Sequence, residues 1–364
     1  MGKKAPPVSR TVNIMKRILS LLRNKRKTEC GARSSSSRSA VRAAPFALLS
    51  LALPCLPLAA GQSLPAPHFH HLHLNSANPE SAIDFYTRQF PSTMKTMVAG
   101  LPALKSGAVY LLFNRVKSPP PTGPQSAIWH FGWHVTDVRK NLEIYRHTSE
   151  VKLLPMFTEP GRPTAEAFIS TDTWPGTGGV LGLTREQIAA AKAQGVQPQG
   201  GPGFAYLEGP DRAIVEYQGN FPAERFNHVH MYQEDPYCAG LWYKNHLSAT
   251  GEIPRGQAEC AAERAAFGWP ALVPEGTRRG PRVNVTFDDI VLTWYPRQGE
   301  RPLVPSRGQV TDHIGLSVNN LDAWMVKLRR EGVKFLRKPY RLGPWRAVMI
   351  EGPSKEALEL IEIK

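Results

Sequence analysis

The chain has 364 residues, with 45 lysines and arginines against 30 acidic residues and a formal charge of +15. Residues 1–61 hold 12 of those basic residues and one acid, so the remainder carries 33 basic against 29 acidic residues. The length accommodates two ordinary domains with cores of their own. Because the positive excess belongs to the first 61 residues, it gives no reason to expect nucleic-acid binding.

Residues 1–61 have the order of a secretory signal. A basic, serine-rich segment ends at Arg42, and the uncharged run AAPFALLSLALPCLPLAAG (43–61) closes with small residues. We therefore predict cleavage near Ala60 or Gly61 and export to the periplasm or the extracellular space. A membrane anchor is the alternative, but two prolines interrupt this short run. We expect no stable membrane span in the mature chain.

The next segment has a copy later in the chain. HFHHLHLNSANPESAIDFYTRQF (68–90) aligns without a gap with RFNHVHMYQEDPYCAGLWYKNHL (225–247). An internal repeat of this length indicates duplicated architecture. The matched histidines are His71 with His228 and His73 with His230.

Each copy predicts a strand, a turn and a helix. Alternating positions in the first seven residues favour a strand. Asn78 and Asp235 each precede a proline, which is typical of a helix start. The remaining two histidines of the first copy, His68 and His70, fall on the opposite strand face, where we expect solvent or rim positions.

Two further pairs of segments match. WHFGWHVTDV (129–138) aligns with DHIGLSVNNL (312–321), and LEGPDRAIVEY (207–217) aligns with IEGPSKEALEL (350–360). The Gly-Pro turns of the second pair predict strand–turn–strand units. The matched polar residues are His130 with His313 and Glu216 with Glu359.

These repeats predict two homologous halves, residues 66–220 and 221–364. Each half holds two βαβββ modules, so we expect an α+β fold whose mixed, curved sheets close around clefts. Gly- and Pro-rich insertions at 158–202 and 250–284 interrupt the halves, and we interpret them as walls or lids. A capping pattern at Thr184 predicts one short helix in the first insertion.

Each half contributes two histidines and one glutamate at strand positions, the ligand set of a facial triad. We expect His71, His130 and Glu216 to meet in the first half. We expect His228, His313 and Glu359 to meet in the second. Such a triad leaves open positions on a metal for substrate oxygens. Fe²⁺ or Mn²⁺ suits the set best, and Zn²⁺ or Ni²⁺ would also bind.

The quoted segments resemble the vicinal oxygen chelate superfamily, which includes glyoxalase I, fosfomycin- and bleomycin-resistance proteins and extradiol dioxygenases. The resemblance covers about 66–364 apart from the insertions. It implies paired βαβββ modules and a divalent metal that chelates two neighbouring substrate oxygens. It also implies ligation by the first-strand histidines and the last-strand glutamates, which are the six residues named above. The additional carboxylate of glyoxalase I has no counterpart near Leu112 or Thr293.

Two more histidines, His73 and His134, lie further along the strand faces of His71 and His130. We predict that they act as proton shuttles or hydrogen-bond donors; filling the floor of the cavity is the alternative. Cys238 and Cys260 either pair in an oxidising compartment or stay free thiols.

The sequence thus predicts a metal-dependent, dioxygenase-like oxidoreductase acting on a small molecule with vicinal oxygens. The alternatives are a glyoxalase-type lyase or isomerase, and a binding protein of the bleomycin-resistance kind.

Overall fold

The computed structural model describes residues 64–118, 120, 127–148, 150–154, 157–159, 162–164, 168–172, 189–190, 193–197, 200–253, 282–297 and 302–364. Residues 62–364 belong to one compact unit. The predicted signal, Cys260, Thr184 and most of both insertions lie outside the described residues. Cys238 takes part in a disulfide bond. Among the described helices, none is long and apolar enough to cross a membrane.

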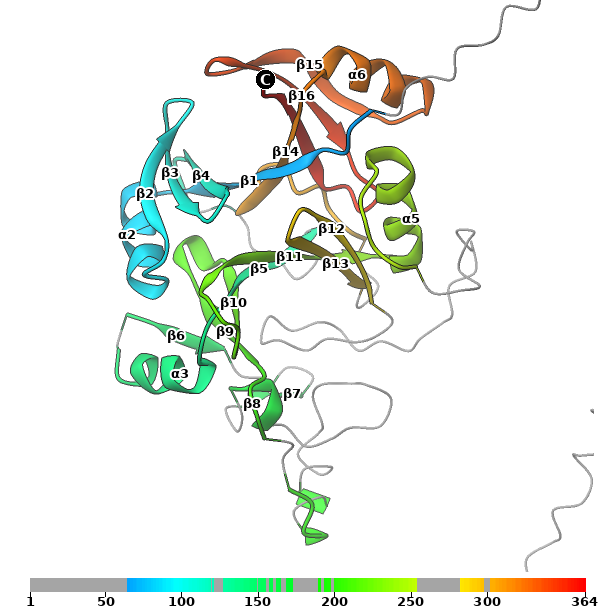
Figure 1. The fold of residues 1–364 in the computed structure, drawn as a ribbon. Coiled ribbons are helices and arrows are strands. Elements are labelled where there is room, and N and C mark those ends of the chain that lie inside the picture. The colour runs from blue at the N-terminus through cyan, green and yellow to red at the C-terminus, as the bar shows by residue number, and fades with distance from the viewer. Residues whose placement is uncertain are drawn as a thin grey trace, which may run out of the picture. The chain divides into compact units, whose positions relative to one another are not determined.

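Along the described chain, helices separate runs of consecutive strands (Figure 1). In order they are β1 His68–Ser76, α2 Pro79–Gln89, β2 Met94–Val98, β3 Leu101–Ser106, β4 Val109–Arg115, β5 Ile128–His134, α3 Val138–Arg146, β6 Lys152–Leu154, β7 Phe157–Glu159, β8 Arg162–Thr164, η1 Ser170–Asp172, β9 Phe204–Glu208, η3 Pro210–Arg212, β10 Ile214–Gln218, β11 Arg225–Gln233, α5 Pro236–Leu247, β12 Val283–Phe287, β13 Ile290–Pro296, β14 Thr311–Val318, α6 Leu321–Arg330, β15 Phe335–Leu342, β16 Trp345–Glu351 and β17 Ala357–Glu362.

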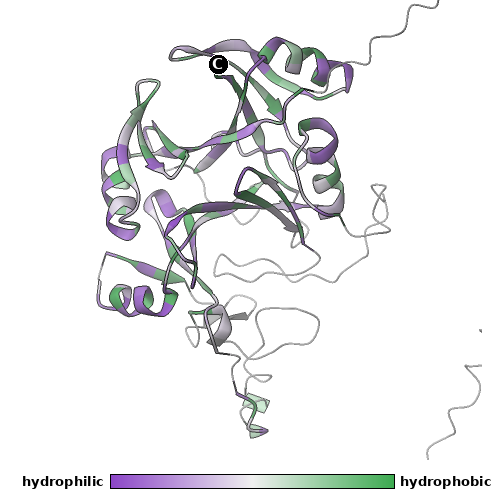
Figure 2. Cartoon of the chain, viewed as in Figure 1, coloured by the Kyte–Doolittle hydropathy of each residue, from purple (hydrophilic) through white to green (hydrophobic). Residues whose placement is uncertain are grey.

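The predicted strand–helix units are confirmed at both copies of the first repeat. The Asn78 side chain accepts a hydrogen bond from the backbone N–H of Ser81, and Asp235 accepts one from Tyr237, so both caps satisfy orphan donors of the first helical turn. The helices carry mixed hydrophilic and hydrophobic residues (Figure 2), and most of their apolar side chains are buried, whereas Ile144 and Val326 are exposed.

Four modules build two sheets, and each sheet combines the two halves of the chain. We number them module 1 (68–115), module 2 (128–218), module 3 (225–296) and module 4 (311–362). Modules 1 and 4 form the sheet β15-β16-β17-β14-β1-β4-β3-β2, and modules 2 and 3 form the sheet β12-β13-β11-β5-β10-β9-β6. The antiparallel pair β1–β14 joins modules 1 and 4 within the first sheet, and the pair β11–β5 joins modules 2 and 3 within the second. The predicted α+β class with curved, mixed sheets is confirmed.

Helix-to-turn contacts hold consecutive modules together. Tyr243 of α5 donates a 2.7 Å hydrogen bond to the carboxyl group of Glu356, which lies in the turn between β16 and β17. The backbone N–H of Ser354 donates to the other oxygen at 2.7 Å. Glu356 is fully buried, and this burial raises its pKa from 4.5 to about 7 despite those hydrogen bonds.

This buried carboxyl group predicts a pH dependence of stability. The folded state keeps a proton on Glu356 between pH 4.5 and about 7 that the unfolded state releases. The free energy of unfolding therefore falls as pH rises through that window, by about 3 kcal/mol from this group. Urea unfolding with a metal chelator present should show a flatter pH profile for Glu356→Gln than for the wild type. Substitution of the exposed Glu143 by Gln is the matched control, and it should leave the wild-type slope unchanged.

Candidate metal centres

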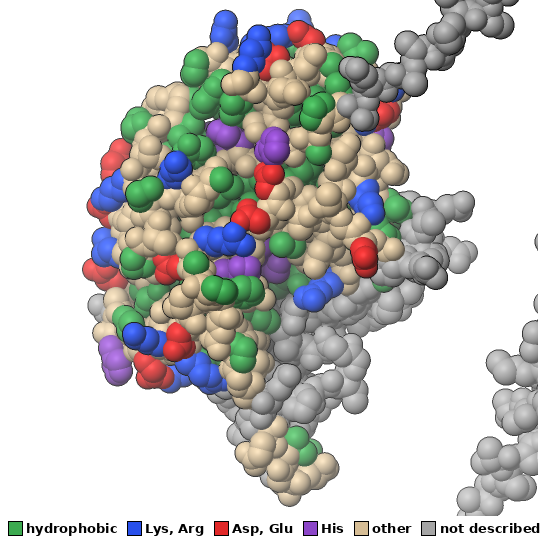
Figure 3. Space-filling view, in the orientation of Figure 1, with side chains coloured by type: hydrophobic (Ala, Val, Ile, Leu, Met, Phe, Trp, Pro, Cys, Tyr) green, Lys and Arg blue, Asp and Glu red, His purple; other side chains and the backbone are tan. Residues whose placement is uncertain are grey.

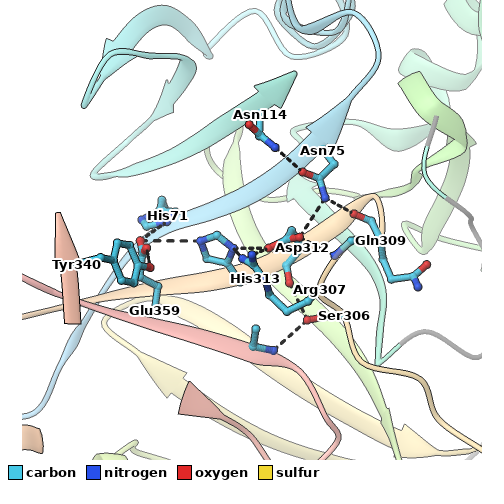
Figure 4. A network of polar contacts seen from close by, with 12 residues as sticks. His71, Asn75, Asn114, Ser306, Arg307, Gln309, Asp312, His313, Tyr340 and Glu359 are labelled. Carbon is cyan, nitrogen blue, oxygen red and sulfur yellow. Dashed lines mark hydrogen bonds and ion pairs between the residues drawn. The ribbon is translucent and has the colours of Figure 1, made fainter. Parts of the chain in front are cut away.

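The first cluster lies where module 1 meets module 4. It consists of His71 on β1, His313 on β14 and Glu359 on β17, and all three side chains are buried. Glu359 Oε2 lies 3.3 Å from His71 Nε2 and 3.8 Å from His313 Nε2. Figure 4 shows the three side chains pointing toward one another from three strands.

The second cluster repeats this arrangement where module 2 meets module 3. It consists of His130 on β5, Glu216 on β10 and His228 on β11. Glu216 Oε2 lies 3.0 Å from His130 Nε2, and Glu216 Oε1 lies 3.8 Å from His228 Nε2. All three side chains are buried here too.

The predicted grouping by halves is wrong, although the six predicted residues do form two sets of two histidines and one glutamate. Glu216 meets His228 rather than His71, and Glu359 meets His71 rather than His228. The reason is the strand pairing. Modules 1 and 2 contribute to different sheets, so His71 of module 1 and His228 of module 3 each reach the glutamate of a module from the other half. His130 and His313 meet the glutamate of their own modules.

Two glycines make room for the ligand rings. His71 lies directly across the strand pair from Gly315, and His228 lies across from Gly132. A Cβ added to Gly315 would lie 1.9 Å from a ring carbon of His71, and one added to Gly132 would lie 2.6 Å from the ring of His228. Both rings therefore fold over the facing strand, and a side chain at Gly315 or Gly132 would block them.

At three of the four ligand histidines, the residue immediately before the histidine contacts the Nδ1 atom of the ligand ring. The Nδ1 atom of His313 donates to Asp312 at 2.6 Å, and the Nδ1 atom of His228 lies 3.2 Å from the Asn227 side-chain oxygen. His70 Nδ1 lies 2.9 Å from His71 Nδ1. Such contacts fix the ring orientation and direct Nε2 into the cluster.

The expected solvent position is confirmed for His68 but wrong for His70. His68 is exposed and pairs with Asp288, whereas His70 is buried between Tyr110 and Trp345. Sequence reasoning missed these supporting residues, because a side chain on the opposite strand face gives no pattern of its own. Their position one residue before each ligand is the signal that would have found them.

Burial sets the charge state of two of the four ligand rings. It lowers the pKa of His71 and lowers that of His228 to about 4, so both are neutral near pH 7. For His313, burial also lowers the pKa, but the hydrogen bond to Asp312 and the nearby carboxylate of Glu359 outweigh it and raise the value. Burial likewise opposes ionisation of Glu359, but His313 and His71 hold its pKa well below the usual range.

The ligand atoms have the properties that a divalent ion requires. The Nε2 atoms of His71, His228 and His313 are buried and make no hydrogen bond within the described part of the chain. Neutral imidazole nitrogens beside an ionised carboxylate are the donors that Fe²⁺, Mn²⁺, Zn²⁺ and Ni²⁺ accept. Buried nitrogens without hydrogen-bond partners are otherwise costly, so both clusters fit a bound metal.

Each cluster opens into a cleft. The cleft at the first cluster has a volume of about 290 Å³, and three arginines line it together with Tyr340 and two asparagines. The cleft at the second cluster measures about 240 Å³ and has mainly uncharged polar and aromatic walls. On the face in Figure 3, acidic and basic side chains are interspersed, and histidine side chains surface among apolar ones.

The two histidines predicted to be catalytic belong to different clefts. His73 lies in the first, where its ring stacks on His313 at 4.4 Å. His134 lies in the second, where its ring stacks on Phe221 at 3.4 Å. Burial is the largest cause that lowers the pKa of His134 to about 4.

Solved structures share this fold. The chain is similar to glyoxalase I from Zea mays, with a TM-score of 0.51 and 15% identity over 82% of this chain and 92% of that chain. It also matches a putative dioxygenase from Bacillus subtilis (TM-score 0.47, 12% identity, 82% and 86% of the chains). A third match is a fosfomycin resistance protein from Listeria monocytogenes complexed with Mn(II) (TM-score 0.26, 11% identity, 38% and 90%). No protein-family model and no curated protein matches the sequence. The match to glyoxalase I shows that the two chains share a fold.

The close approach at Gly315 predicts the effect of a small substitution. Gly315→Ala places a methyl group where the His71 ring lies, so the ring or the strand must move. We expect the free energy of unfolding to fall by about 1–3 kcal/mol, as for an overpacked core. Chemical denaturation measures it. Ser317→Ala, two residues along the same strand, should cost less than about 0.5 kcal/mol, and an equal cost for both would contradict the steric argument.

Proposed function

We propose that the chain is a divalent-metal-dependent enzyme of the vicinal oxygen chelate superfamily. Its small substrate would chelate the ion through two neighbouring oxygens. The observation that carries this proposal is that two histidines and one glutamate converge where module 1 meets module 4, and again where module 2 meets module 3. A ligand set retained twice, at matching places in a duplicated fold, is not explained by packing alone.

The six residues of the two clusters would hold the ions, with Fe²⁺ or Mn²⁺ as the best fit and Zn²⁺ or Ni²⁺ as alternatives. When bound, such an ion acts as a Lewis acid on substrate oxygens and orients the substrate. The protein supplies buried walls, neutral imidazoles and the orienting contacts of Asp312 and Asn227.

For the reaction, we keep the dioxygenase-like oxidation of a vicinal-oxygen substrate as the first candidate. A lyase or isomerase reaction is the alternative, and a metal-independent binding protein is the third. His134 faces the second cleft with a neutral ring, so it is placed to accept a proton there. His73 is the corresponding candidate in the first cleft. Oxygen uptake during turnover separates the first candidate from the second.

The walls of the first cleft favour an anionic substrate. Arg307, Arg337 and Arg341 line it, against the carboxylates of Asp312 and Glu359. Arg307 is paired with Asp312 at 2.6 Å, whereas the guanidinium of Arg337 stacks on the Tyr340 ring at 3.7 Å. Once a divalent ion balances the two carboxylates, the arginines leave an excess of positive charge for a carboxylate or phosphonate group.

We further propose that the mature protein acts outside the cytoplasm, after removal of residues 1–61. The basic and then apolar order of that segment supports export, and the disulfide bond at Cys238 fits an oxidising compartment.

Metal analysis of paired variants tests the proposal. We expect the wild type to bind about two ions per chain. His71→Ala combined with Glu359→Ala should leave one ion, because both residues belong to the first cluster. His71→Ala combined with Glu216→Ala should leave none. Elemental analysis after dialysis against trace metal gives the count, and substitution of the exposed His147 by Ala is the control. Full metal loss in the first double variant would contradict two independent sites.

Binding of oxalate, a dianion with neighbouring oxygens, tests the arginine-lined cleft. In metal-loaded protein, Arg337→Gln should weaken oxalate binding at the first cleft about tenfold through the lost charge. Arg346→Gln is the matched control, because Arg346 pairs with Asp322 and Glu362 away from the cleft. Isothermal titration in the His130→Ala, His228→Ala background isolates the first site. Equal affinity of both arginine variants would argue against an anion site here.

A further inference from the structure

A third histidine accompanies each cluster at a matching place. The ligand nitrogens of His71, His73 and His313 all lie within 4.8 Å of one another. In the second cluster, His230 joins His130, Glu216 and His228 within the same limit. Ligand atoms about 2.1 Å from one ion are separated by roughly 3 to 4 Å, so the grouped atoms need small side-chain adjustments. Glu359 lies near His71 and His313 but outside the group that holds His73, so it would have to approach His73 when an ion binds.

The sheet register explains why a histidine stands there. In modules 2 and 4, the first strand carries Gly132 or Gly315, and the adjacent strand places Glu216 or Glu359 beside it. In modules 1 and 3, the first strand carries a histidine at the corresponding place, and the adjacent strand carries an uncharged residue. His73 lies beside Leu112, and His230 lies beside Thr293, on the corresponding strand pairs. The position that carries a carboxylate in modules 2 and 4 therefore offers no charge in modules 1 and 3, and the imidazole lies next to it.

The surroundings of the His73 ring also fit a metal ligand, a role that would replace proton transfer by this ring. Its side chain is about nine-tenths buried, and its Nδ1 atom makes no hydrogen bond within the described residues. The ring stacks on the ligand His313 at 4.4 Å and lies 6.1 Å from that of His71. A polar nitrogen buried among ligands without a hydrogen-bond partner is best satisfied by the same cation.

The geometry points to His73 and His230 as the fourth protein ligands, so that each site has three histidines and one glutamate. This inference rests on the proposed metal function. Four protein ligands leave two positions of a six-coordinate ion, enough for the two oxygens of a chelating substrate.

X-ray absorption of the Zn²⁺-loaded full chain counts imidazoles without any substitution. We expect three imidazole ligands per ion as the average over both sites. An average of two would overturn the inference while leaving the metal function intact. A chain that binds no Zn²⁺ at all would overturn the proposed function itself, so the two failures are distinguishable.

A variant series tests His73 directly, in the His130→Ala, His228→Ala background that keeps only the first cluster. His73→Gln should lower Zn²⁺ affinity by more than about 100-fold, beyond the 10–100-fold typical of a residue that only orients a ligand. Competition with a chelating dye measures the affinity. Leu342→Ala, which replaces an apolar residue that lines the same cleft, is the control and should change the affinity less than about tenfold. An unchanged affinity in His73→Gln, with a folded circular dichroism spectrum, would assign His73 to stacking alone.

Discussion

The antiparallel pairing of first strands across the two halves is the constraint on which both sites depend. β1 pairs with β14, and β11 pairs with β5, so each junction brings two histidine-bearing strands side by side. The ring of His71 or His228 must then fold over the facing strand, which is sterically permitted only because Gly315 or Gly132 stands opposite. The glycine has no catalytic chemistry of its own, but it determines whether the imidazole can reach the glutamate of the neighbouring module.

The two clusters share this framework and differ in their surroundings. In the first, Asp312 holds His313 by a charge-assisted hydrogen bond, and arginines line the cleft. In the second, Trp129 stands at the position of Asp312, Asn227 contacts His228 at the position that His70 has beside His71, and the walls are mostly uncharged. Under the proposed function, the two sites would hold the same kind of ion but select different substrates. The ligand set would decide the metal, whereas the surrounding residues and the cleft walls would decide the charge of the substrate.

Much of the fold was predictable because its signals are local. The alternation in HFHHLHL, the caps at Asn78 and Asp235, and the Gly-Pro turns each act within a few residues, and each forms as predicted. All six proposed metal ligands were identified from matched repeats, which compare one module with another. The buried position of His70 and the role of Asp312 were not predictable, because they depend on neighbours from distant segments.

By itself, the sequence determined which side chains share a strand face, where helices begin, and which residue types recur at matching positions in the modules. Only the tertiary structure decided that module 1 pairs with module 4 and module 2 with module 3, and hence that Glu359 meets His71 and Glu216 meets His228. The physical reason is that side-chain alternation is fixed by the local backbone, whereas the partner of an exposed strand edge is chosen by the burial and hydrogen bonding of the whole chain. Four similar strands offer several pairings, and no short segment can distinguish among them.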